Sequence, residues 1–179
     1  MVLSIEERKL FFKNWLGLLS FVNKKHKVIK NFGNPKNPFG LNIDDIKEIR
    51  EKLWKNTLII DEYLHNCKIS KEDIMIISLW KKRIKGKYMV IKDLKKFTVL
   101  MDFENKKLYG VHGISNSINE MIPSIPMMVE TVLLPFSGKI IFDSIMGIDN
   151  VYFGKNMRQS FHEEYMELKN SIGIINKIE

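Results

Sequence analysis

The residues best suited to chemistry gather in one basic segment, Lys81–Lys96, which has eight cationic side chains against the single acid Asp93. Three aromatic residues lie within or directly beside it, namely Trp80, Tyr88 and Phe97. Cations attract a phosphate backbone and exposed rings stack on bases, so the segment predicts a surface that contacts RNA or DNA. Its cations are Lys81, Lys82, Arg83, Lys85, Lys87, Lys92, Lys95 and Lys96.

The composition of the whole chain offers another explanation for this basic segment, namely a general excess of lysine that has no binding function. The 179 residues include 29 basic and 21 acidic side chains, and the formal net charge is +8. Residues 1–100 have a net charge of +11 and residues 101–179 of −3. However, 25 of the 29 basic residues are lysine, which is the composition that an AT-rich genome imposes on any protein. Base readout and bidentate phosphate contacts favour arginine, which is scarce in this chain. Any nucleic-acid binding is therefore expected to be electrostatic and weakly specific.

Two acidic residues, Glu130 and Asp143, are the candidates for catalysis. A two-residue turn at Ser137–Gly138 predicts that Glu130 pairs with Ile145, which makes the two carboxylates diagonal neighbours roughly 7 Å apart on one face of a hairpin. Carboxylates on an otherwise apolar face have raised and separated pKa values, as general acid–base pairs do. This arrangement suggests a hydrolase-like enzyme. The alternative is that both acids are solvated or paired with a cation such as Lys139.

The methionine-rich segment Met121–Met128 suggests a third kind of function. Methionine side chains adapt to varied surfaces, so an exposed cluster of them would suit a protein partner or a second copy of the chain. The opposite charges of the two halves of the sequence would also suit pairing between proteins.

Other classes of site lack their motifs. The sequence contains no glycine-rich phosphate loop, nucleophile elbow, zincin motif or dinucleotide fingerprint. Its one cysteine, Cys67, excludes a disulfide framework, and four widely separated histidines favour no metal site. No run is long enough to cross a bilayer. We expect no signal peptide in the first helical segment, because Glu6 and Glu7 occupy the place of a basic leader and no small-residue cleavage site follows Val22. We therefore expect no metal, no cofactor and a cytoplasmic location.

Helical periodicity and capping residues favour four helices before residue 86. The apolar pattern of Thr57–Cys67 fits either a helix or a buried strand, and helix is favoured because Asp61 and Glu62 interrupt the apolar run. The stretch Phe32–Leu41, rich in Gly and Pro, is expected to be a loop, and Gly86 is expected to end the fourth helix. The four helices are expected to begin at Ser4, Asn42, Thr57 and Ser70, with Asp73 completing the capping box of the last.

After Gly86 the apolar period changes from about 3.6 to 2, which indicates strands. A last helix is expected over Lys155–Ser171, with Gly173 at its end. The grouping of strands predicts an α+β fold: a helical block at 1–86, then an antiparallel sheet of about five to six strands with a C-terminal helix at 87–179, together one cooperative domain. The strands are expected at Tyr88–Ile91, Phe97–Phe103, Leu108–His112, Met128–Leu134, Ile140–Ile145 and Val151–Phe153.

Two segments carry a family resemblance, YGVHGIS at 109–115 and ETVLLPFSGKIIFDS at 130–144. They resemble an uncharacterised protein family of low-GC bacteria that shares a YGV…LLPF-x-GK-I-I-aromatic-D pattern. The resemblance covers about residues 85–173, and some longer members carry a cysteine-rich zinc tail that this chain lacks. It implies a bacterial protein and supports the fold boundary near Gly86, but it implies no activity. On the residues alone, the best-supported function is a non-enzymatic binding or regulatory module for nucleic acid.

Overall fold

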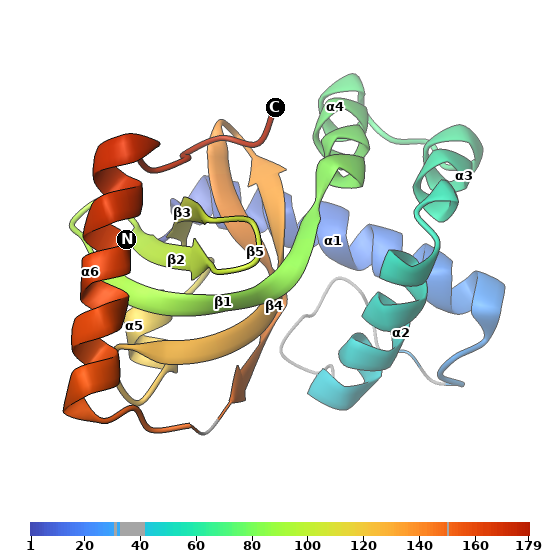
Figure 1. Cartoon of the computed structure of the whole chain (residues 1–179). Coiled ribbons are helices and arrows are strands. Elements are labelled where there is room, and N and C mark those ends of the chain that lie inside the picture. Colours follow the sequence, from blue (N-terminus) through green and yellow to red (C-terminus); the bar gives the residue numbers. More distant parts are fainter. Residues whose placement is uncertain (31, 33–41, 150) are drawn as a thin grey trace. The chain divides into compact units, whose positions relative to one another are not determined.

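A computed structural model describes residues 1–30, 32, 42–149 and 151–179, and the chain divides into two compact units (Figure 1). The helical unit is Ile5–Lys81, and the barrel unit combines Met1–Ser4 with Lys82–Glu179. The predicted α+β class is confirmed, with a helical block, five strands and a C-terminal helix. The predicted loop at Phe32–Leu41 lies, apart from Phe32, outside the described residues.

The helical unit is organised around the long first helix, whose apolar residues are buried as its periodicity predicts. Trp15 is 1% exposed, stacks on Trp54 at 5.7 Å between ring centroids and meets Trp80 edge-on at 5.8 Å. No helix in the described parts of the chain is long and apolar enough to span a membrane. The elements are α1 (Ile5–His26), α2 (Ile43–Lys55), α3 (Leu58–Asn66), α4 (Lys71–Leu79) and a short 3₁₀ turn at Trp80–Lys82.

A buried carboxylate joins α4 to α1 within the helical unit. Ser70 caps α4 as predicted, because its hydroxyl accepts the Asp73 amide at 3.1 Å and donates to the Asp73 carboxylate at 2.7 Å. Lys13 of α1 donates to the same carboxylate oxygen at 2.6 Å. Burial raises the pKa of Asp73, but the hydrogen bonds from Lys13 and Ser70 outweigh it, so the pKa lies below its ordinary value.

The five strands of the barrel unit close into a barrel in the order β1-β2-β3-β5-β4. The first three form a meander and β4 returns to pair with β1, which is a Greek key. Four pairings are antiparallel as predicted, but β3 and β5 are parallel at Val111 and His112, because β5 enters between β3 and β4. The strands are β1 (Ile84–Asp93), β2 (Thr98–Asp102), β3 (Lys107–His112), β4 (Met127–Phe136) and β5 (Lys139–Asp149), with the short helix α5 (Ile118–Met121) between β3 and β4.

The change from helix to strand occurs earlier than predicted. The fourth helix ends at Leu79 rather than near Ile84, and Gly86 lies inside β1 instead of stopping a helix. A Cβ atom on Gly86 would lie 3.1 Å from the hydroxyl oxygen of Tyr88, which donates to the carbonyl of Ile84 at 3.0 Å. Gly86 is therefore needed for the close approach of the Tyr88 side chain within the strand.

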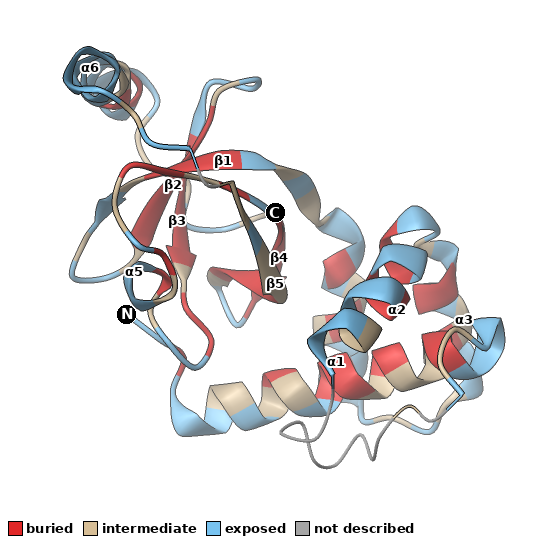
Figure 2. Ribbon diagram, turned by 90° about the horizontal axis from the view of Figure 1, so that it is seen from below, coloured by how far each residue is buried: buried red, intermediate tan, exposed pale blue. Residues whose placement is uncertain are grey.

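A C-terminal helix, α6 (Lys155–Ser171), covers the outer face of β1, β2 and β3. The strands β2 and β3 are accordingly buried along most of their length (Figure 2). Tyr165 and Leu168 of α6 pack into a cluster with side chains of the three strands, which gives this face of the barrel a second apolar layer. The strand residues of the cluster are Met89, Val99, Met101 and Leu108.

The predicted last strand at Val151–Phe153 is wrong. These residues are not in a strand, and Tyr152 is 76% exposed. The carbonyl of Phe153 accepts a hydrogen bond from Arg158 at 2.9 Å, and its ring packs on Phe161 at 5.0 Å. The apolar residues that suggested a strand therefore lead into α6, and the side chain of Phe153 packs against that helix instead of a sheet.

We predict that Asp73→Asn lowers the free energy of unfolding at pH 7 by about 1–3 kcal/mol, because it weakens a charge-assisted hydrogen bond to a buried group. The folded-state pKa of Asp73 is depressed, so its contribution is present above the ordinary carboxyl pKa and is lost as the pH falls through the folded value. The difference between variant and parent should therefore shrink in acid. Urea titrations between pH 2 and pH 7 measure both effects.

The matched control is Asp61→Asn, which disrupts an exposed pair with Lys81 and should cost at most about 1 kcal/mol. Equal stabilities of the two variants at pH 7 would contradict the role given to Asp73.

Candidate nucleic-acid interface

The turn between β1 and β2 carries two of the exposed cations of the barrel unit. Lys95 and Lys96 are exposed, and neither has an ion-pair partner among the described residues. The turn is held by the Leu94 amide, which donates to the Phe97 carbonyl at 3.0 Å, and by Thr98, whose hydroxyl donates to Asp93 at 2.7 Å. The two lysines are thus presented to solvent on an ordered turn.

The cations on β1 itself are largely paired. Lys85 lies 4.0 Å from Glu130, and Lys87 lies 3.5 Å from Asp149. Residues two apart on a strand share a face, so both lysines lie on the outer face of the barrel beside the acids of β4 and β5. A phosphate would have to compete with these carboxylates, which reduces the contribution that β1 makes to anion binding.

The remaining cations of the basic segment differ in exposure. Lys82 is exposed, whereas Arg83 is half-buried and burial lowers its pKa. Lys92 is exposed, and its ammonium lies 5.9 Å from the ring centroid of Tyr165 on α6. Lys81 belongs to the helical unit, where it donates to Asp61 at 2.7 Å. The predicted segment is therefore not one continuous surface.

Two of the three predicted stacking residues are unavailable to bases. Trp80 and Tyr88 are both fully buried, and burial raises the pKa of the Tyr88 hydroxyl. Both fit the apolar faces of their elements, which was the alternative open at the sequence level. Phe97 differs because it is only partly buried, beside the β1–β2 turn, and its ring meets His112 edge-on at 6.3 Å.

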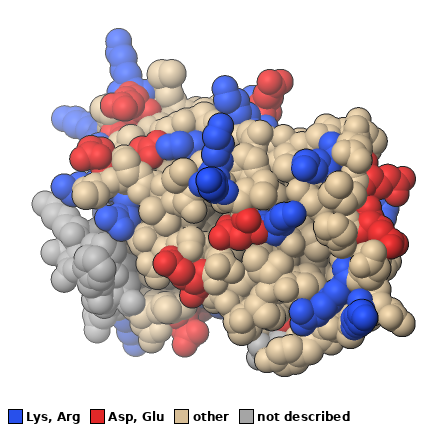
Figure 3. Space-filling model, turned by 90° about the vertical axis from the view of Figure 1, so that its left-hand side faces the viewer, with Lys and Arg blue, Asp and Glu red and all other residues tan. Residues whose placement is uncertain are grey.

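Charge alternates over the molecular surface. On the face shown in Figure 3, basic and acidic side chains interleave instead of separating by sign. A net charge of +8 therefore does not produce one broad positive field on this face, and any anion site there depends on local geometry.

The proposed catalytic pair is not assembled. Glu130 pairs with Gly147 rather than Ile145, because β5 bulges between Phe142 and Met146. At the centre of the bulge Ser144 has a φ of 72°, and Asp143 is fully buried. The Glu130 side chain is 48% exposed beside Lys85. The two acids therefore lie further apart along the sheet than predicted. Glu130 is exposed and paired with a cation, as the alternative to a catalytic role expects.

The methionine-rich segment does not form an exposed apolar surface. Met127 is 1% exposed inside the barrel, and Met128 is partly buried against the cluster beneath α6. Met121 is also partly accessible. One of the three methionines is thus a core side chain and the other two are partly buried, and a protein partner that binds through them stays a prediction.

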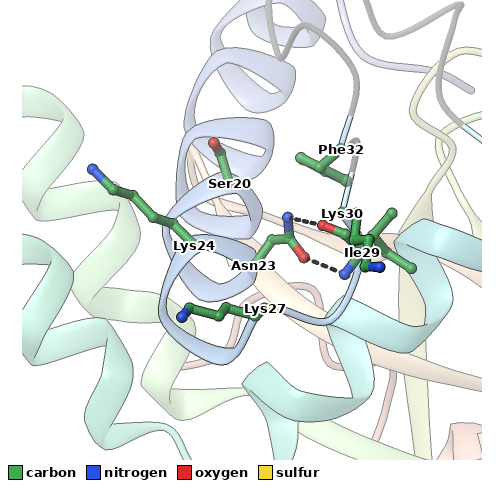
Figure 4. Close-up of a pocket in the computed structure, with 7 residues that line it drawn as sticks. All are labelled: Ser20, Asn23, Lys24, Lys27, Ile29, Lys30 and Phe32. Atoms are coloured by element: carbon green, nitrogen blue, oxygen red, sulfur yellow. Dashed lines mark hydrogen bonds between the residues drawn. The ribbon is translucent and has the colours of Figure 1, made fainter.

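The helical unit has a groove of about 430 Å³ beside the end of α1 (Figure 4). Lys24, Lys27 and Lys30 surround it, and Asn23 lies at its centre. The Asn23 amide accepts from the Ile29 backbone at 2.8 Å and donates to it at 3.0 Å, so its polar atoms close the turn after the helix. The groove is thus lined by a turn and solvated lysines. Among the described residues, no group of three histidine, cysteine or acidic side chains is placed to hold a metal.

One cation beside the β4–β5 turn, Lys177, was not identified from the sequence. Its Cε atom would lie 3.9 Å from a Cβ built on Gly138, which places a cation of the C-terminal segment at the β4–β5 turn. No local pattern indicates this position, because it depends on a long-range pairing between the C-terminus and β3.

No family model matches the chain, and comparisons with curated proteins and with solved structures also give no match.

We predict that Met127→Glu destabilises the protein by about 4 kcal/mol or more without acting through an oligomer interface, because it places a carboxylate at a buried position. Met157→Glu is the control, since Met157 is 51% exposed on α6 and its substitution should change stability by at most about 0.5 kcal/mol. Chemical denaturation with light scattering on both variants distinguishes the cases. A stable Met127→Glu protein with a changed oligomeric state would restore the interface hypothesis.

Proposed function

We propose that the barrel unit is a cytoplasmic, non-enzymatic module that contacts single-stranded RNA or DNA through the β1–β2 turn and the surface next to it. The observation that carries the proposal is the coincidence of two features. The strands form a five-stranded Greek-key barrel, and two adjacent exposed cations for which the described chain holds no ion-pair partner, Lys95 and Lys96, lie on its β1–β2 turn.

The architecture supports this choice of surface. A five-stranded Greek-key barrel with this strand order is the architecture of the OB fold, which binds oligonucleotides and oligosaccharides on strands 2 and 3 and on the turns β1–β2 and β4–β5. Because α6 covers the outer face of β2 and β3 in this protein, only the two turns of that surface support the proposal. A shared architecture does not by itself imply a shared function. The charges therefore matter: Lys95 and Lys96 favour the anionic ligand over a neutral oligosaccharide.

The expected mode of binding follows from the residue types. Lysine ammonium groups attract phosphates as point charges. Phe97 is the one partly exposed ring beside the basic segment; it packs at the edge of the cluster beneath α6, so a base would stack on the part of the ring that remains accessible. Few arginines and no second free ring in the segment favour contacts with the backbone over reading of base edges. The ligand is thus a flexible single strand, bound with little sequence preference.

We predict that a mixed-sequence 12-nucleotide RNA or DNA binds the protein at low salt, with log affinity falling linearly with log salt concentration. Three exposed cations at or next to the turn, Lys92, Lys95 and Lys96, correspond to a slope of about −2, at about −0.7 per phosphate contact with a single strand. The double variant Lys95→Glu/Lys96→Glu should bind at least about tenfold more weakly and flatten the slope by about 1.4. Fluorescence anisotropy across a salt series gives both values.

The matched control is Lys47→Glu/Lys52→Glu, which makes the same change of net charge at two exposed positions of α2 in the helical unit. It should bind as the parent does, within about a factor of two, after allowance for net charge. Equal losses in both double variants would mean that binding follows overall charge and not the β1–β2 turn. No binding by the parent at low salt would refute the proposal.

A further inference from the structure

The C-terminal tail, Ile174–Glu179, lies against the barrel after α6 has ended. Gly173 takes a φ of 77°, which ends the helix and redirects the chain. Ile175 then donates to the carbonyl of Leu108 at 2.8 Å and accepts from the amide of Gly110 at 2.9 Å. These two bonds make a parallel bridge between Ile175 and Tyr109, so the tail adds a short strand segment to β3.

The tail occupies a part of β3 that the barrel leaves open. One edge of β3 pairs with β2, and on its other edge β5 pairs only with Val111 and His112. The Leu108–Gly110 stretch would be an unpaired edge without the tail. Such an edge exposes backbone donors and acceptors to any extended chain that can reach it.

The tail also lies between the two turns that flank the proposed interface. A Cβ on Gly110 would lie 2.4 Å from the side-chain oxygen of Asn176 and 2.9 Å from the ring of Phe97, so both side chains converge on the bare backbone of this glycine. One residue further on, Lys177 reaches the β4–β5 turn at Gly138. The tail therefore spans from Phe97, at the end of the β1–β2 turn, to the β4–β5 turn.

From this geometry we infer that the tail is an autoinhibitory segment that competes with a single strand for the surface beside β3. This inference rests on the proposed function. The tail covers the backbone next to Phe97, the ring expected to stack on a base, and it crosses the region between the two turns where this barrel architecture binds oligonucleotides. Displacement of the tail exposes the β3 edge and the adjoining face of Phe97 together.

The attachment of the tail is suited to reversible release. Two backbone hydrogen bonds hold it at Ile175, and Ile174 packs at the edge of the cluster beneath α6. Asn176, Lys177 and Glu179 are exposed. If the tail covers the surface about nine-tenths of the time, the apparent dissociation constant of the ligand is about tenfold higher than that of the uncovered surface.

The test is deletion of residues 174–179, measured with the same mixed-sequence 12-nucleotide RNA by fluorescence anisotropy. The deleted segment contains one lysine and one glutamate, so the net charge does not change and electrostatics alone predicts no effect. We expect binding to tighten about tenfold, and a synthetic peptide of residues 172–179 to reverse the gain. Deletion of residues 178–179 alone is the control, since it keeps both hydrogen bonds to β3, and it should bind as the full chain does.

A second pair of variants covers the case in which the deletion impairs folding. Ile175→Pro removes the amide that donates to Leu108, whereas Ile178→Pro leaves both bonds of Ile175 and the Asn176 side chain in place. Thermal denaturation verifies that each variant is folded. Tighter binding by Ile175→Pro and not by Ile178→Pro supports the autoinhibitory tail.

The possible results separate the two proposals. Equal affinity of the full chain, the deletion and Ile175→Pro would overturn the autoinhibitory tail and leave the nucleic-acid proposal standing. Binding by the deletion or by Ile175→Pro, but not by the full chain, would support both. No binding by any of them at low salt would refute the proposed function, and the inference would fall with it.

Discussion

The barrel unit depends on one strand that pairs along both of its edges. β1 pairs with β2 on one side and with β4 on the other, so the row of five strands becomes a closed ring. Closure removes most of the free sheet edges, which otherwise favour aggregation, and leaves the Leu108–Gly110 stretch of β3 for the C-terminal tail to pair with. β1 also contributes buried side chains on both of its faces: Tyr88 is fully buried, and Met89 packs beneath α6. The bulge after Val90 bends the strand where its charged end begins and brings Lys92 over the ring of Tyr165.

Features encoded by neighbouring residues could be predicted from the sequence. Ser70 and Asp73 form the predicted cap, because both partners lie within one helical turn. The hairpin at Ser137–Gly138 forms as predicted, with both residues at positive φ as a two-residue turn requires. The α+β class follows from the same local periodicities. Each of these depends on residues within a few positions of one another.

Features set by distant partners could not be predicted in this way. The parallel pairing of β3 with β5 depends on the position of β5 between β3 and β4 in the strand order, and no local sequence pattern encodes that position. The bulge around Ser144 moved Gly147 opposite Glu130, although nothing about a serine at that position signals a positive φ. Gly86 was interpreted as a helix stop, whereas its role is to make room for Tyr88. For the candidate site, the sequence did not indicate the acids that pair with Lys85 and Lys87, because these acids lie on β4 and β5, far away along the chain.

The barrel unit is discontinuous in the chain, and this has a consequence for its order of assembly. Leu3 donates to the carbonyl of Gly113, whose own amide donates to Met1, so the first residues bond to the segment after β3. During synthesis the whole of α1 to α4 is made between these two partners. The earliest residues of the barrel unit must therefore wait for more than half of the chain before they can be incorporated, and the helical unit is complete before its neighbour can close.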